Sequence, residues 1–203
     1  MERKASYICT QEKNRYVNTD QQLIEAIAKG DTDALQNLYD RYAAKVYNTA
    51  LSYVKNVPEA EEITQDVFLK ICKAAHKFEG NSTVSTWIYR IAINTALSTV
   101  KRKKRFAFLQ FGKEDTTYTD FEHPGVSMEK KEEAKMLYRV IDGLPDNQKT
   151  AFILSYIEEL PRQEVADVME ISLKATESLL QRAKKSLRER LTKLYPNRRN
   201  SEK

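Results

Sequence analysis

The chain has 203 residues, which is enough for one large domain or two small ones. It contains only five glycines and five prolines, too few for a turn-rich β protein, so the composition favours helices. No apolar run approaches the roughly 20 residues that span a bilayer, and the N-terminus MERKASYICTQEKNRY lacks the apolar core of a secretory signal. Two isolated cysteines and two histidines argue against a metal site or other cofactor. We therefore expect a cytoplasmic protein without membrane insertion.

The net charge of +5 is modest, but the charged residues are unevenly distributed. Residues 79–105 and 172–203 are each net basic, whereas residues 106–171 between them are net acidic. Charges that served only solubility would be mixed along the chain. Two separate basic blocks indicate two contacts with one polyanion.

The N-terminal half predicts successive amphipathic helices. Asp31 is a candidate cap for a helix whose apolar residues recur at spacings of three and four. Pro58, followed by the acidic residues of EAEE, marks the start of the next helix. Negative charge is stabilised there by the helix dipole. After the loop HKFEGNSTVST, a further helix is expected from about Val84 to Arg105. We interpret residues 1–19 as a tail and residues 20–105 as the first domain.

Residues 106–129 lose this periodicity and contain two glycines and a proline, so we expect a flexible linker there. The helical pattern returns over residues 130–195, which we interpret as a second domain, with residues 196–203 as a basic tail. The predicted fold class is therefore all-α, with two small helical domains joined by a flexible linker.

The segment PRQEVADVMEISLKATESLLQRAKKSLRERL has the layout of a helix-turn-helix, with a turn at residues 170–172 and a long helix to about Leu194. A DNA major groove accepts such a helix, whose N-terminal side chains reach the bases. An ordinary amphipathic hairpin with a solvated basic face fits the pattern equally well. Glu170 stands in the turn at a position where glycine most easily adopts a left-handed conformation. A residue other than glycine there costs on the order of 1 kcal/mol.

On a helical wheel of residues 84–105, apolar side chains occupy two flanks and a narrow polar line runs between them. We call this line the polar ridge; it comprises Trp87, Arg90, Asn94, Ser98, Lys101 and Arg105. Such a line suits single-stranded nucleic acid, because an indole stacks on bases for about 1–3 kcal/mol each and cations follow the phosphates. The polar loop before the helix is a candidate receptor for an extruded base. Taken singly, Trp87 is more simply a core anchor and Asn94 a satisfied half-buried amide.

Five motifs follow one another at characteristic distances: LIEAIAKGDTDALQNLYDRYAAKVYNTAL, EAEEITQDVFLKI, STWIYRIAINTALSTVKRKKR, LPDNQKTAFILSYIEELPRQEVADVM and LLQRAKKSLRERL. In these motifs the chain resembles a bacterial extracytoplasmic-function (ECF) sigma factor of RNA polymerase over about residues 20–105 and 130–192. The resemblance implies two helical domains that bind core RNA polymerase. The first melts and reads the −10 promoter element, partly as single strand, and the second reads the −35 element as duplex. Family members are also commonly held by an anti-sigma factor, which no motif identifies here.

The resemblance assigns residues to each contact. For −10 DNA it implies the loop and the ridge with its neighbour: Gly80, Asn81, Ser82, Thr83, Trp87, Arg90, Asn94, Ser98, Lys101, Arg102 and Arg105. For −35 DNA it implies the start of the last helix: Lys174, Thr176, Glu177, Ser178, Gln181, Arg182 and Lys185. For core polymerase it implies one acidic helix face: Glu62, Gln65, Asp66 and Leu69. Glu177 and Leu179 replace a cation pair that is usual in the family, so the −35 base preference does not carry over.

Other functional classes of protein fit the sequence less well. No Gly-rich phosphate loop or Ser/His/Asp arrangement occurs, and His76 and His123 lie in unrelated settings, so we do not expect an enzyme. A helix-turn-helix repressor or activator with a ligand-sensing or dimerising N-terminal domain is the second hypothesis. A duplex-only regulator would need neither the polar ridge nor an acidic docking helix. A helical scaffold with solvated basic faces is the third, and the segregated charge counts against it.

Overall fold

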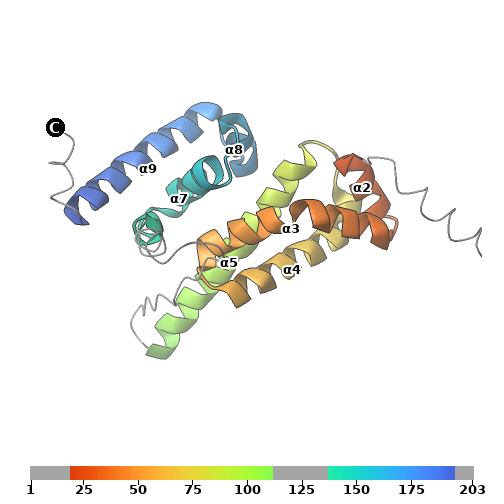
Figure 1. The fold of residues 1–203 in the computed structure, drawn as a ribbon, viewed down its shortest axis with the longest axis horizontal. Coiled ribbons are helices and arrows are strands. Elements are labelled where there is room, and N and C mark those ends of the chain that lie inside the picture. The colour runs from red at the N-terminus through yellow and green to blue at the C-terminus, as the bar shows by residue number, and fades with distance from the viewer. Residues whose placement is uncertain (1–18, 112–136, 195–203) are drawn as a thin grey trace, which may run out of the picture.

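The computed structural model describes residues 19–111 and 137–194. Within these ranges the regular elements are helical, as predicted. In chain order they are α2 (Asp20–Ile27), α3 (Thr32–Val54), α4 (Val57–Ala74), η1 (Ala75–Lys77), α5 (Val84–Phe111), α7 (Asp146–Phe152), η2 (Ile153–Ile157), α8 (Arg162–Met169) and α9 (Leu173–Leu194). Figure 1 shows α2–α5 as one bundle and α7–α9 as a second group. No helix of the described ranges is long and apolar enough to cross a membrane.

The predicted helix starts are confirmed by their capping bonds. The Asp31 Oδ1 atom accepts from the backbone amides of Asp33 at 2.9 Å and Ala34 at 3.0 Å, so it satisfies two donors that the first turn of α3 leaves unpaired. Asn56 caps α4 through the amide of Glu59 at 3.0 Å, and Pro58 lies in the first turn, where no amide donor is needed.

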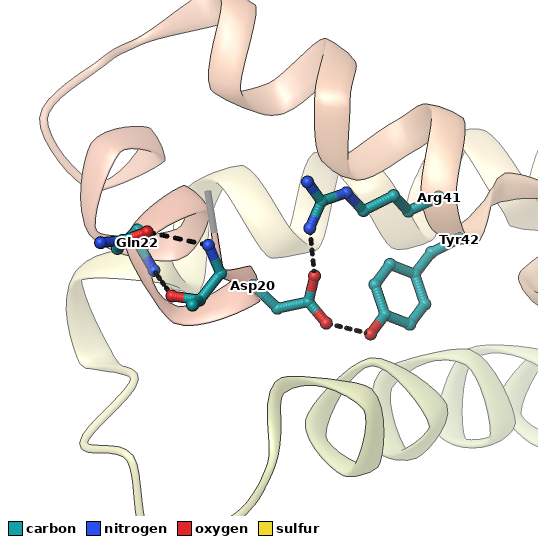
Figure 2. A network of polar contacts seen from close by, with 5 residues as sticks. Asp20, Gln22, Arg41 and Tyr42 are labelled. Atoms are coloured by element: carbon teal, nitrogen blue, oxygen red, sulfur yellow. Dashed lines mark hydrogen bonds and ion pairs between the residues drawn. The ribbon is translucent and has the colours of Figure 1, made fainter. Parts of the chain in front are cut away.

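The Asp20 carboxylate fastens α2 to α3 (Figure 2). It pairs with Arg41 Nη1 at 2.9 Å and accepts a hydrogen bond from the Tyr42 hydroxyl at 2.5 Å. Burial, followed by the neighbouring Asp20 carboxylate, raises the pKa of Tyr42 above its usual value. The phenol therefore stays protonated and remains a donor at neutral pH.

The core of the first domain lies where α3, α4 and α5 meet. Its fully buried side chains include Leu38 and Val46, two turns apart on α3, then Ile63, Val67 and Ile71 at intervals of four on α4, and Ile88 on α5. Helix α5 continues to Phe111, beyond the predicted end at Arg105, and its last turns project past α3 and α4 (Figure 1). The expected linker therefore does not begin at residue 106. The rest of that segment and both predicted tails, apart from Thr19, lie outside the described residues.

The second domain is built around α9. Residues 137–142 are helical, and Val140 and Ile141 pack with Ala183 and Leu187 of α9 in a separate apolar cluster. Glu170 ends α8 in the left-handed conformation, with φ 56° and ψ 40°, as its position in the turn predicts. The Ser172 Oγ atom then accepts from the amide of Ala175 at 3.2 Å and caps α9.

The two domains contact each other. Ile153 and Leu154 of η2 are fully buried in the same apolar cluster as the core of the first domain. Beside them, the Tyr53 hydroxyl of α3 donates to Thr150 Oγ1 of α7 at 2.8 Å in a buried setting. The second domain therefore packs against the first through both apolar and polar contacts.

The cap of α3 gives a direct test of this local account. Asp31→Ala should lower the free energy of unfolding by about 1 kcal/mol, because two amides at the helix start lose their acceptor. Asp33→Ala is the matched control: Asp33 is also acidic and exposed in the first turn, but it does not cap the helix. Urea unfolding measures both variants. Equal losses would show that charge near the helix start, rather than capping, stabilises α3.

Candidate nucleic-acid interface

The structure places the polar ridge on the surface of α5. Its neighbours Ile88, Tyr89, Ala92, Ile93 and Ala96 are buried. The ridge residues Asn94, Ser98, Lys101 and Arg105 are exposed, and Trp87 and Arg90 are half-buried. The predicted division of this helix into two buried flanks and one open line is confirmed. Its contact with DNA remains a prediction.

Trp87 stands at the head of the ridge and has two roles in the geometry. Its ring packs against Phe78, with centroids 5.1 Å apart and planes inclined by 47°. The side chain is nevertheless half-buried rather than enclosed, so part of the indole faces solvent. It therefore anchors the helix start and also offers an aromatic surface on which a base can stack.

The loop before α5 is held by its own hydrogen bonds. Gly80 has φ +75°, a conformation that a side chain would strain. Asn81 Nδ2 donates to Glu79 Oε2 at 3.0 Å. Thr83 Oγ1 accepts from the amide of Thr86 at 3.1 Å, so the Thr83 side chain caps the helix. The loop is therefore fixed next to Trp87, with Asn81 and Thr83 exposed and Ser82 half-exposed.

The five cations from Lys101 to Arg105 are all exposed, but they point in different directions. Lys103 Nζ bonds Glu59 Oε1 of α4 at 2.6 Å, so it faces the bundle. Lys101 and Arg105 continue the line of the ridge, with Arg102 beside it. The Lys101 Nζ atom lies 3.9 Å from Asp146 Oδ2 of α7. Part of the basic run is thus available to phosphates, and part stabilises contacts within the protein.

Helix α9 presents a second polar face. Lys174, Glu177, Gln181, Arg182 and Lys185 are exposed on it, and Ser178 is half-exposed. Glu177 pairs with Arg162 of α8 at 3.5 Å, and Arg182 Nη2 lies 3.0 Å from Ser178 Oγ. The negative charge of Glu177 is compensated by Arg162, so the remaining cations give this face of α9 a net positive charge.

One assignment to this face is wrong. Thr176 is fully buried, and its hydroxyl bonds the Ser172 carbonyl oxygen at 3.3 Å, so it cannot reach DNA. Its position was readable in the sequence, because Thr176, Leu180, Ala183 and Leu187 follow one another at spacings of four, three and four. All four are buried and all but Thr176 are apolar, which identifies the inner stripe of α9.

A third surface lies on α4. Glu62, Gln65, Asp66 and Leu69 are exposed along one helix face, and Leu69 keeps 56% of its surface open. Next to them, a groove of about 400 Å³ lies on the surface between α3 and α4. Its lining residues are Tyr39, Ala43, Ala44, Tyr47, Glu61, Thr64 and Gln65. The tyrosines of this groove were not predicted from the sequence, since they lie at the edge of the apolar stripe of α3 and resemble core residues there.

The described residues contain no group of three or more His, Cys, Asp or Glu side chains placed to hold a metal ion. What the three surfaces offer is recognition: aromatic stacking, amide hydrogen bonds and cations on α5, a polar and cationic face on α9, and an acidic face with an apolar groove on α4.

Comparisons with known proteins agree with this arrangement. Residues 38–106 match the Sigma-70 region 2 family and residues 134–187 match Sigma-70, region 4. The chain is 31% identical to the ECF RNA polymerase sigma factor SigW of Bacillus subtilis, over 84% of this chain and 96% of SigW. Its fold is similar to CnrH in complex with the cytosolic domain of CnrY, with a TM-score of 0.66, 20% identity, and coverage of 86% and 97%. It is also similar to RpoE of Bartonella quintana in complex with the anti-sigma factor NepR, with a TM-score of 0.63, 18% identity, and coverage of 77% and 96%.

The α9 face yields a paired prediction. Lys185→Gln should leave stability unchanged within about 0.5 kcal/mol, because Lys185 is exposed. It should lower the slope of log affinity against log salt for a mixed-sequence DNA duplex by about 0.9. Thr176→Val should change stability by about 1 kcal/mol through the lost hydroxyl bond and leave the salt slope unaltered. Fluorescence anisotropy over a salt series and urea unfolding measure the two quantities. A reduced salt slope for Thr176→Val would show that Thr176 contributes to DNA binding after all.

Proposed function

The chain belongs to the ECF sigma factors of RNA polymerase, transcription initiation factors that direct the enzyme to promoters, and we propose that its surfaces divide this task. The polar ridge and the preceding loop bind the opened strand of the −10 element. The exposed face of α9 reads the −35 element as duplex. The acidic face of α4 docks on core polymerase.

The ridge carries the proposal. A helix buried on two flanks leaves one line of side chains outside the core, and that line combines an indole, an amide, a hydroxyl and cations. Aromatic stacking combined with phosphate-tracking cations is the usual chemistry of single-strand binding. The rigid loop at its head, from Gly80 to Thr83, is placed to receive a base that has left the stack beside Trp87, which costs a few kcal/mol of unstacking.

The α9 face suits duplex DNA. Lys174 lies in the first turn of α9 and Gln181 two turns further on, and both are exposed. In a helix-turn-helix, this end of the second helix enters the major groove. Arg182 and Lys185 then neutralise phosphates, and the slope of affinity with salt reports their number. The exposed Glu177–Arg162 pair joins α9 to α8 on the same side of the domain.

The α4 surface suits a protein partner. A cluster of acidic residues repels the DNA phosphates, whereas a basic protein surface complements it. The exposed Leu69 and the groove lined by Tyr39 and Tyr47 add apolar area, which gives a partner helix something to bury. Core RNA polymerase is the partner that this division of the task requires.

The remaining parts of the proposal follow from this role. The protein acts in the cytoplasm, where polymerase and promoters are found, and it has no catalytic activity of its own. An anti-sigma factor is a further partner that we propose by analogy with the complex of RpoE and NepR.

Reconstituted transcription tests the proposal. The purified chain should bind core RNA polymerase and direct runoff transcription from a small set of genomic fragments, whose start sites identify the two promoter elements. Substitution of the −35 element should then matter less to a Lys174→Ala, Gln181→Ala variant than to the unaltered chain, because these exposed side chains are the ones proposed to reach the base edges. Tight binding to promoter duplex without polymerase, together with no transcription in its presence, would favour a repressor.

Trp87→Ala separates melting from docking. The variant should bind core polymerase as the unaltered chain does and form open complexes poorly, because the first opened base loses its stacking partner, worth about 1–3 kcal/mol. Trp87→Phe, which keeps an aromatic ring against Phe78, should retain more activity. Permanganate reactivity of promoter thymines measures opening. If Trp87→Ala instead unfolds at a much lower temperature and loses polymerase binding as well, then Trp87 is mainly a core residue.

A further inference from the structure

The last turns of α5 carry large apolar side chains that face water. Phe106, Phe108 and Leu109 are each exposed over most of their surface. These turns lie beyond the point where Lys103 bonds Glu59 of α4, and they project past the bundle (Figure 1). Exposed apolar side chains grouped in this way mark a surface that a partner covers.

Two of these side chains continue the polar ridge. From Trp87 to Arg105 the ridge residues follow one another at steps of three or four, so they stay on one side of the helix. Phe108 is three residues beyond Arg105 and Leu109 is four, so both lie on that side. Phe106 follows Arg105 directly and points about 100° away from the line. We call Phe108 and Leu109 the ridge end.

The ridge end adjoins the basic run of α5. Arg102, Lys104 and Arg105 are exposed and lie within about two turns of Phe108. Positive charge at this density attracts a polyanion and repels a basic protein surface. Charge and continuity with the ridge therefore favour DNA as the occupant of the ridge end. The inference rests on the proposed function, because the ridge is taken to be a DNA-binding surface.

The position of the ridge end favours paired rather than opened DNA. Phe108 lies 21 residues after Trp87, which is about 32 Å along the axis of an α-helix. DNA rises about 3.4 Å per base, so this distance corresponds to about nine base steps from a base at Trp87. The second domain, proposed to read the −35 element as duplex, follows α5 in the chain. We therefore expect α5 to run from the opened bases towards paired DNA on the −35 side.

Paired DNA offers a group that suits an apolar side chain. Bases in a duplex are stacked on one another, so a phenylalanine cannot stack on them without separating them. In the major groove, thymine presents its C5 methyl group, which makes apolar contacts with side chains such as phenylalanine. We propose that the ridge end binds thymine methyl groups in the duplex directly upstream of the −10 element, while Arg102 and Arg105 bind the flanking phosphates.

Exchange of thymine for deoxyuridine tests this proposal, because it removes only the C5 methyl group. Polymerase holoenzyme formed with the full-length chain is titrated against a fluorescein-labelled fork-junction DNA of a mapped promoter. Thymines within about ten base pairs of the fork on the −35 side are kept or replaced by deoxyuridine, and the −35 element is left unaltered. Fluorescence anisotropy should show about two- to fourfold tighter binding of the thymine form, because the methyl groups are buried against the ridge end.

Two phenylalanines of equal exposure provide a matched pair of variants. Phe108 is 63% exposed on the line of the ridge, and Phe106 is 64% exposed away from it. Phe108→Ala should abolish the difference between the thymine and deoxyuridine forms, and Phe106→Ala should retain it. Equal binding of the two DNAs by the unaltered chain overturns the proposal, and so does an equal effect of the two variants.

Two other occupants of the ridge end give different results. If Phe108→Ala weakens binding of core polymerase and leaves the thymine preference intact, the ridge end contacts the polymerase. If Phe108→Ala lowers the free energy of unfolding and leaves the preference intact, another segment of this chain covers the ridge end. Either result overturns the proposal.

Trp87→Ala distinguishes failure of this inference from failure of the proposed function. It should weaken binding of both forms of the DNA by the same factor, because it removes stacking on the opened base and leaves the ridge end intact. If Trp87→Ala leaves binding unchanged, the ridge does not hold the opened strand and the proposed function fails. A thymine preference that Phe108→Ala abolishes would still place the end of α5 in the major groove.

Discussion

Burial of both flanks of α5 is the constraint on which the rest of this structure depends. Ile88 and Ala92 on one flank, and Tyr89, Ile93 and Ala96 on the other, are withdrawn from water by the surrounding helices. A helix held in this way cannot rotate about its axis without exposing apolar surface, at about 25 cal/mol for each Å². The polar ridge is therefore fixed in direction before any DNA arrives. The stacking and phosphate contacts proposed for it would need little further ordering of the protein.

The same constraint explains the contact between the domains. A fixed line of polar and cationic groups attracts any acidic surface within reach, and the second domain carries one on the same chain. The end of α8 supplies a carbonyl and the Glu170 carboxylate to Arg90, while Ile153 and Leu154 add apolar area. The two domains are therefore joined by polar, ionic and apolar contacts.

Helices, caps and the division of α5 into buried and open lines were predictable, because they depend on local periodicity and on side chains such as Asp31 that act within one turn. The end of α5 was not: residues 106–111 lack a clear apolar period, yet they continue the helix from a stable segment. Thr176 was misassigned because the family resemblance put it at the DNA, although its spacing with Leu180, Ala183 and Leu187 places it on the inner face of α9. The pairing of Arg90 with α8 joins residues 77 apart in sequence, and no local pattern contains that information.

Photocrosslinking tests the central claim most directly. A p-benzoylphenylalanine placed at Ser98, on the exposed middle of the ridge, is compared with one at Lys103, which faces Glu59 on α4. In open complexes with core polymerase, the Ser98 probe should crosslink to the opened −10 strand and the Lys103 probe should not. Equal crosslinking from both positions, or crosslinks from Ser98 to duplex DNA alone, would contradict the role of the ridge.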